Sequence, residues 1–248
     1  MLWPLSPLET LWCATALMVG YGVRGVAGFG SGVVATPLLA FVLPMTMTAP
    51  LITLVGFLVS VRQAFRGWHE IRWKAVLSFA PGALVGVPLG LWMVKTADQA
   101  LLTRFLGVYV VAYALYSLFG ERLLGRALSM PRWMVHPISV VGALISTLFG
   151  GLAGPLYVTY FDSLRLAKGT FRVTVSTTLL TLSIVRSTGY FVTGVFRADG
   201  LILVVAALLP VAIGTLAGEW VHDRVEQQAF RRGVGALLVL SGMGLLLR

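Results

Sequence analysis

Long, nearly continuous runs of apolar residues follow one another along this chain, with polar residues confined to short stretches between them. A helix that crosses a bilayer needs roughly 20 mostly apolar residues. Outer-membrane barrel strands alternate apolar and polar residues over about ten positions, a pattern that these longer runs do not follow. The pattern therefore predicts an all-α polytopic membrane protein with these apolar segments: 8–43, 47–65, 74–95, 100–119, 136–163, 170–194, 200–221 and 229–247.

Two of these segments are too long for a single crossing. As one helix, segment 8–43 would measure about 54 Å at 1.5 Å per residue. Glycine costs about 1 kcal/mol inside a helix, and glycines cluster in both long segments. They are Gly22, Gly25, Gly28, Gly30 and Gly32 in the first, and Gly150, Gly151 and Gly154 in the second. We predict that each long segment is a broken helix or a hairpin turning inside the membrane, with Pro37 and Pro155 in the first turn of the resumed helix.

The two halves of the chain resemble each other. Gly28-Phe-Gly-Ser-Gly32 corresponds to Gly150-Gly-Leu-Ala-Gly154, and Gly86-Val-Pro-Leu-Gly-Leu-Trp92 corresponds to Gly214-Thr-Leu-Ala-Gly-Glu-Trp220. Chance similarity in an apolar, glycine-rich chain is the alternative. A real duplication predicts one transmembrane repeat over 1–120, a linker over 121–135 and a second repeat over 136–248. Each repeat would open with the broken helix or hairpin and continue with three spans.

Composition and charge then narrow the class and suggest an orientation. Only 11% of the residues are charged, against about 25% in soluble proteins, which excludes a soluble enzyme. The net charge of +10 would suggest a nucleic-acid partner in a soluble protein, but cytoplasmic loops of membrane proteins also collect Lys and Arg. We therefore expect the bilayer as the partner and no nucleic acid.

The loop charges discriminate between two topologies. Eight simple crossings would distribute the Lys and Arg residues almost equally between the two sides. If each long segment instead enters and leaves on the same side, 13 basic residues face one side and 4 the other. By the positive-inside rule this second arrangement is favoured, with a cytoplasmic linker and both termini outside. The two repeats would then be inverted, a design typical of secondary transporters with broken helices.

The glycine-rich stretches resemble those of the sulfite exporter (TauE/SafE) family of membrane proteins. They read Gly28-Phe-Gly-Ser-Gly-Val-Val-Ala-Thr-Pro-Leu-Leu39 and Phe149-Gly-Gly-Leu-Ala-Gly-Pro-Leu156, although Ser31 interrupts the usual run of glycines. The resemblance implies a secondary transporter for a small anion, typically sulfite or an organosulfonate such as sulfoacetate. It further implies a multi-pass protein of the cytoplasmic membrane, and we expect export by alternating access.

The residues themselves also favour an anion. Helix N-termini at the breaks attract anions, and an arginine offers a planar fork to oxyanions. A charge inside the membrane costs about 2.5–3.5 kcal/mol, so Arg186 and Arg62 suggest function. The predicted substrate-binding residues are Gly28, Gly30, Ser31, Gly32, Arg62, Gly150, Gly151, Gly154, Thr174, Thr177 and Arg186.

Each of these groups also has an interpretation in which it does not bind the substrate. The glycines would also serve helix packing, and Arg62 would also reach the cytoplasmic face. The hydroxyls of Thr174 and Thr177 would also bond their own helix. Arg24, at the first break, either guards the pathway or faces headgroups.

No acid or histidine lies clearly at mid-membrane, so we expect no obvious proton-coupling residue, and coupled transport through Asp162 or Glu219 stays open as the alternative. We expect no metal, cofactor or catalytic group. An intramembrane serine protease using Ser31 would need a base in reach, and all three histidines fall outside the spans. A structural or assembly subunit is the other alternative, and monomer and homodimer both remain open.

Overall fold

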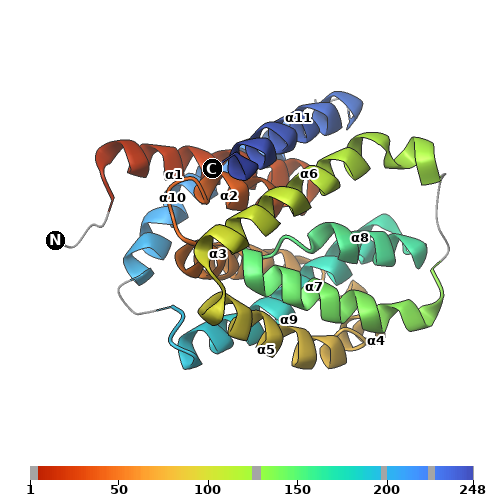
Figure 1. Cartoon of the computed structure of the whole chain (residues 1–248). Helices are drawn as coiled ribbons and strands as arrows, with labels where there is room; N and C mark the ends of the chain where they lie inside the picture. Colours follow the sequence, from red (N-terminus) through yellow and green to blue (C-terminus); the bar gives the residue numbers. More distant parts are fainter. Residues whose placement is uncertain (1–4, 125–129, 197–199, 223–226, 248) are drawn as a thin grey trace.

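The computed structural model describes residues 5–124, 130–196, 200–222 and 227–247, and within these ranges its secondary structure is helical throughout (Figure 1). The prediction of an all-α polytopic fold is thereby confirmed. The α-helices are α1 (Pro7–Ala27), α2 (Ser31–Leu39), α3 (Met45–Arg66), α4 (Trp73–Leu77), α5 (Ala80–Thr96), α6 (Gln99–Leu124), α7 (Val135–Phe149), α8 (Gly154–Ser163), α9 (Lys168–Val192), α10 (Leu201–Val221) and α11 (Gln227–Leu246).

Both long apolar segments break at their glycines, as predicted. Helix α1 ends at Gly28 (φ 82°) and α2 begins after Gly30 (φ 91°), while α7 ends at Gly150 (φ 70°), which Gly151 (φ 99°) follows. These left-handed conformations strain any residue with a Cβ, which explains glycine at all four turn positions. The glycines therefore reverse the direction of the chain and do more than lower the stability of a helix.

The two prolines behave differently from each other. Pro155 lies in the first turn of α8, as predicted. The prediction for Pro37 is wrong, because the helix already resumes at Ser31 and Pro37 falls in the last turn of α2. Its missing N–H removes a hydrogen bond there, and α2 ends at Leu39, after only nine residues.

The turns make α1–α2 and α7–α8 into two hairpins that enter the helix assembly from opposite ends (Figure 1). Their turn regions meet in the interior. A Cβ on Gly32 would lie 3.0 Å from the carbonyl oxygen of Gly150. Thr36 Oγ1 donates a hydrogen bond of 2.9 Å to the carbonyl of Phe149. At Gly32 the two hairpins therefore meet backbone against backbone, and one turn further along α2 the Thr36 hydroxyl links them.

Each hairpin packs against a helix from the other half of the chain. Helix α1 packs along α10, α7 packs along α5, and α3 with α9 and α6 with α11 form the remaining large contacts. Glycines at the contact faces of these helices allow the backbones to approach closely. A Cβ on Gly90 of α5 would lie 2.6 Å from Cβ of Thr147, and one on Gly25 of α1 would lie 2.5 Å from the carbonyl of Thr215 on α10.

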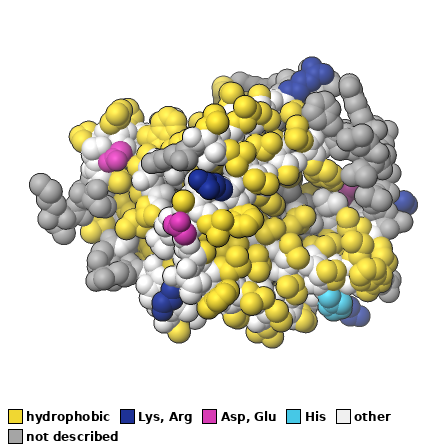
Figure 2. Space-filling view, in the orientation of Figure 1, with side chains coloured by type: hydrophobic (Ala, Val, Ile, Leu, Met, Phe, Trp, Pro, Cys, Tyr) yellow, Lys and Arg dark blue, Asp and Glu magenta, His cyan; other side chains and the backbone are white. Residues whose placement is uncertain are grey.

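The outer surface suits a lipid environment. Figure 2 shows hydrophobic side chains over most of the visible face, with only scattered charged groups. Leu84, Trp92, Leu209 and Trp220 are among the exposed apolar side chains. By length and apolar character, three described stretches could cross a membrane: Trp73–Thr96, Gln99–Leu118 and Leu201–Val221.

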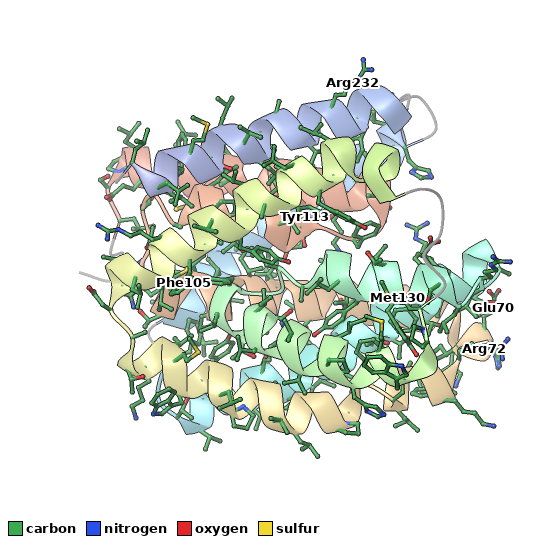
Figure 3. All side chains as sticks on the ribbon, turned by 45° about the vertical axis from the view of Figure 1, so that its right-hand side comes forward. Glu70, Arg72, Phe105, Tyr113, Met130 and Arg232 are labelled. Carbon is green, nitrogen blue, oxygen red and sulfur yellow. The ribbon has the colours of Figure 1, made fainter. Side chains whose placement is uncertain are left out.

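The two ends of the helix assembly contain different segments of the chain. Trp12 near the start of α1 packs edge-on against Phe41, which also approaches Gly244 near the end of α11, so the first described helix begins and the last one ends at the same end of the assembly. At the opposite end the backbone N–H of Arg72 donates to Thr174 Oγ1 at 3.2 Å. Figure 3 places Glu70, Arg72 and Met130 together there. These are residues of the basic loops and of the end of the linker that the sequence assigns to the cytoplasm.

Candidate functional site

A small cavity lies where the two hairpin turns meet α3 and α9. Its volume is about 30 Å³, which is room for about two water molecules. The described residues that line it are Arg24, Phe29, Gly30, Ser31, Gly32, Ile52, Thr53, Gly56, Ser60, Gly150, Gly151, Gly154, Leu179, Ser183 and Arg186. The cavity thus gathers residues that are far apart in the sequence from both halves of the chain.

Arg186 reaches the cavity from the C-terminal third of α9 and is 2% exposed. Its Nη2 donates a hydrogen bond of 3.1 Å to Ser183 Oγ, one turn earlier on the same helix. Its Nε and Nη1 are buried without a hydrogen-bond partner among the described residues. A buried N–H without an acceptor costs about 1–3 kcal/mol, and more for a charged group. These donors are therefore available to a ligand that supplies oxygen atoms.

Arg24 reaches the same cavity from the last turn of α1 and is 4% exposed. Its Nη2 donates a hydrogen bond of 2.8 Å to Ser60 Oγ on α3. Ser60 in turn donates to the carbonyl of Gly56, also at 2.8 Å. Of the two roles considered for Arg24, contact with headgroups is wrong, because the side chain is buried between helices.

The described lining residues include two arginines and no carboxylate. Of the acids whose side chains are described, Glu9, Glu70, Asp98 and Asp162 are not buried and Glu219 is only partly buried, and none of them lines the cavity. The side chains of 62–66 on α3 lie outside the described part, but that stretch contains no acid. The described lining of the cavity therefore contains two positively charged side chains and no negatively charged one.

Two helix N-termini add to this charge. Helix α2 begins at Ser31 and α8 at Gly154, and both residues line the cavity. The residues before them, Gly30 and Ala153, provide no side-chain cap. The first N–H groups of a helix lack partners within the helix and carry about half a positive charge in total. Both termini thus favour an anion at the place where the arginines lie.

The structure brings together most of the predicted site residues. Gly30, Ser31, Gly32, Gly150, Gly151, Gly154 and Arg186 all line the cavity. Gly28 does not, because it ends α1 beside Arg172, whose Nε would lie 3.4 Å from a Cβ there.

Three further predicted residues remain to be placed. Thr174 and Thr177 also lie outside the lining, since Thr174 accepts from the backbone of Arg72 and Thr177 donates to the carbonyl of Val173 at 2.9 Å. Arg62 belongs to α3, but its side chain lies outside the described residues.

The predicted site residues did not include Thr53, Gly56, Ser60 and Ser183, and Arg24 was considered only as an arginine at the first break. Two of these leave a local signal. Ser183 precedes Arg186 by three positions and therefore shares its helix face. Ser60 follows Gly56 by four positions on α3, and a Cβ on Gly56 would lie 3.8 Å from Nη1 of Arg24. The pairing of Ser60 with Arg24 joins separate helices, and no local pattern in the sequence contains it.

The fold and the cavity together define a multi-pass helical membrane protein with a charged interior site closed by two broken helices. Residues 12–245 match the family described as Sulfite exporter TauE/SafE, and the chain belongs to this family. It is 24% identical, over 79% of its length and 81% of the relative's, to the "Probable inner membrane transporter protein TsaS" of Comamonas testosteroni. No solved structure matches the chain.

The chain is therefore a transporter of the inner membrane, and the prediction that it is not an enzyme is confirmed by this kinship. The sequence resemblance to the family is confirmed by the same match. Membership also accounts for the membrane environment and for a small-molecule substrate.

Proposed function

We propose that the protein moves a small oxyanion across the inner membrane through the cavity between its hairpins. The observation that carries this proposal is the pair of buried guanidinium groups, Arg24 and Arg186, on one cavity whose described walls hold no carboxylate. Burying a charge in a membrane is expensive, and the cost is reduced when a ligand of opposite charge binds. An anion that accepts hydrogen bonds from both arginines would offset the cost of burying their two charges.

Sulfite or a short organosulfonate such as sulfoacetate is the substrate class that we propose. Three oxygens around one sulfur match the planar donor forks of two arginines and the hydroxyls of Ser31 and Thr53. The family's description as sulfite exporters supports the same class. An interior-negative potential drives each exported negative charge by about 2.3 kcal/mol per 100 mV, so export needs no further coupling ion.

A panel of anions tests the substrate class. We expect sulfite and sulfoacetate to raise the thermal unfolding midpoint of the purified protein, because a ligand bound only to the folded state stabilises it by about 2.7 kcal/mol at 100 times its Kd. Acetate should act less, since its single carboxylate engages one arginine only. Ammonium and choline, which the two arginines repel, are the matched controls. Equal shifts with anions and cations would contradict an anion site.

Alternating access follows in this proposal from two inverted repeats, 1–120 and 136–248, joined by the linker 121–135. This arrangement is supported by helices of one half that pack on helices of the other: α1 lies on α10, and α7 lies on α5. Under the proposed correspondence of α1 with α7 and α5 with α10, these two contacts are equivalent. The α3–α9 and α6–α11 contacts then pair each helix with its own counterpart. Rocking of one repeat against the other would open the cavity to each side in turn.

The orientation of the termini is a separate prediction. Both chain ends lie opposite the basic loops, so the positive-inside rule predicts both ends in the periplasm. Fusions of alkaline phosphatase to either end should be active, because the enzyme needs the periplasm to form its disulfides. Fusions of a fluorescent protein that matures only in the cytoplasm should be dark at both ends. A fluorescent C-terminal fusion would contradict the inverted arrangement.

A further inference from the structure

A second pocket, larger than the interior cavity, lies at the end of the assembly opposite the basic loops. Its volume is about 340 Å³, against about 30 Å³ for the cavity between the hairpins. The segment between α2 and α3, the first turns of α6 and the end of α11 form its walls. The described apolar residues that line it are Ala40, Val42, Leu43, Pro44, Ala100 and Leu245. A volume of this size is typical of pockets that hold an organic ligand.

The described polar side chains of the pocket come from the start of α6. Gln99 Oε1 accepts a hydrogen bond of 2.9 Å from the backbone N–H of Met45. Thr103 Oγ1 donates a hydrogen bond of 2.8 Å to the carbonyl of Gln99. The guanidinium of Arg104 forms neither a hydrogen bond nor an ion pair with another described residue, and no carboxylate is among the described lining residues. Arg104 is therefore available to an anionic group in or above the pocket.

Arg104 lies on a face of α6 that suits contact with lipid. It shares this face with Leu101, Phe105 and Val108, which are 48%, 54% and 56% exposed. Helix α6 lies on the outside of the assembly (Figure 1), and its stretch Gln99–Leu118 could cross a membrane. Arg104 follows Gln99 by five residues, which is about 8 Å along the helix. An arginine so close to the end of a span extends its guanidinium to the lipid headgroups.

The pocket thus combines an apolar floor with a cationic rim. Leu43 and Leu245 are buried at the floor, whereas Ala100 and Arg104 are exposed at the rim. A ligand that matches both parts has a hydrocarbon chain and an anionic headgroup. Sulfite or a short sulfonate would leave the apolar floor unfilled. The ammonium group of a zwitterionic lipid would find no carboxylate among the described lining residues. A phospholipid with net negative charge fits both the floor and the rim.

We propose that this pocket binds one anionic phospholipid of the surrounding bilayer, with its phosphate on Arg104 and part of one acyl chain against Leu43 and Leu245. The inference is independent of the proposed function, because the described linings of the pocket and of the interior cavity share no residue. Helix α2 nevertheless connects them, since Ser31 at its start lines the cavity and Ala40 at its end lines the pocket. The bound lipid therefore contacts a hairpin that closes the interior cavity.

Photo-crosslinking tests the site in the purified protein. The probe is phosphatidylglycerol with a diazirine on one acyl chain, and mass spectrometry identifies the residues that it labels. We expect labelling at Leu43 and Leu245. Unlabelled phosphatidylglycerol should displace it at a concentration at least about fivefold lower than phosphatidylcholine, the equivalent of about 1 kcal/mol for one arginine at the membrane surface. Labelling at Leu209, an exposed residue of α10 outside the described pocket lining, reports non-specific contact and should show no such preference.

Three variants separate the contributions of the charge and of the pocket. Arg104→Gln should remove the preference for phosphatidylglycerol, whereas Arg232→Gln, at an exposed position of α11 outside the described lining, should retain it. Ala100→Trp narrows the mouth of the pocket from an exposed position and should abolish labelling inside it while Arg104 is intact.

Four results would overturn the inference. Equal displacement by the two lipids in the wild type would contradict an anionic headgroup, and an unchanged preference in Arg104→Gln would contradict the role of the arginine. Unchanged labelling in Ala100→Trp would mean that the acyl chain lies outside the pocket. Displacement by glycerol 1-phosphate at the same concentration as by phosphatidylglycerol would mean that the pocket takes a free phosphate anion and not a lipid.

Discussion

Replacing Arg186 with methionine is expected to abolish anion transport and, at the same time, to stabilise the empty protein. Removing one partner of a desolvated, hydrogen-bonded charge pair costs about 2–5 kcal/mol, which weakens anion binding about 30-fold or more. The free protein loses a buried charge that no described carboxylate compensates. Replacement of buried ionic groups by apolar ones of similar volume often stabilises by about 1–4 kcal/mol.

Thermal unfolding with and without sulfite measures both effects in one experiment. Arg186→Met should unfold at least about 2 °C higher than the wild type without sulfite, and should show no sulfite-induced rise. Arg232→Met removes an exposed arginine and should change neither value. A lower unfolding midpoint combined with an unchanged sulfite response would mean that Arg186 holds the helices together and does not bind the anion.

A second large effect is expected at the turn between α7 and α8. Gly150 has a φ of 70°, and a Cβ there would lie 2.9 Å from Cβ of Ile52 and 3.0 Å from the carbonyl oxygen of Ala49. Gly150→Ala therefore adds a clash with α3 to the strain of the left-handed conformation, and displaces the turn that forms one wall of the cavity. We expect sulfite flux in proteoliposomes to fall at least about tenfold, as for a misplaced binding group.

Gly194 provides a matched control for the backbone strain alone. Its φ is 68°, and a Cβ there would meet nothing within 4 Å. Gly194→Ala should therefore cost about 1 kcal/mol of stability and leave the flux unchanged. If both variants lose flux equally, strain alone explains the loss and the fit of the turn against α3 is unimportant.

Much of the fold could be predicted from the sequence because the lipid environment permits few backbone structures. Backbone groups in hydrocarbon must be satisfied within a helix, so apolar length translates directly into helices. The breaks were predictable for a similar reason, since glycines at 28, 30, 150 and 151 allow left-handed turns that other residues resist. Pro37 was misplaced because Gly28 and Gly30 already turn the chain before Ser31, and nothing in the local pattern says which of several helix-breaking residues acts.

The site was less accessible to sequence reasoning, because its geometry depends on which helices lie side by side. Thr174 belongs to the most polar stretch of α9, yet it contacts the backbone of Arg72 and not the cavity. Arg24 was ambiguous because an arginine four residues before a helix end can point either way. Only the tertiary structure, in which α1 packs along α10 and Arg24 meets Ser60 of α3, decides that this arginine is buried. No local sequence pattern indicates that helices of one half of the chain pack against helices of the other half.

The position of a bound oxyanion is the most direct test of an anion site between Arg24 and Arg186. Selenite has the charge and shape of sulfite, and its selenium can be located by anomalous X-ray scattering from crystals grown with it. The predicted result is a selenium peak enclosed by the two hairpin turns, with oxygens in contact with both guanidinium groups. A selenium peak elsewhere in the protein, with the cavity between the arginines unchanged, would contradict the account.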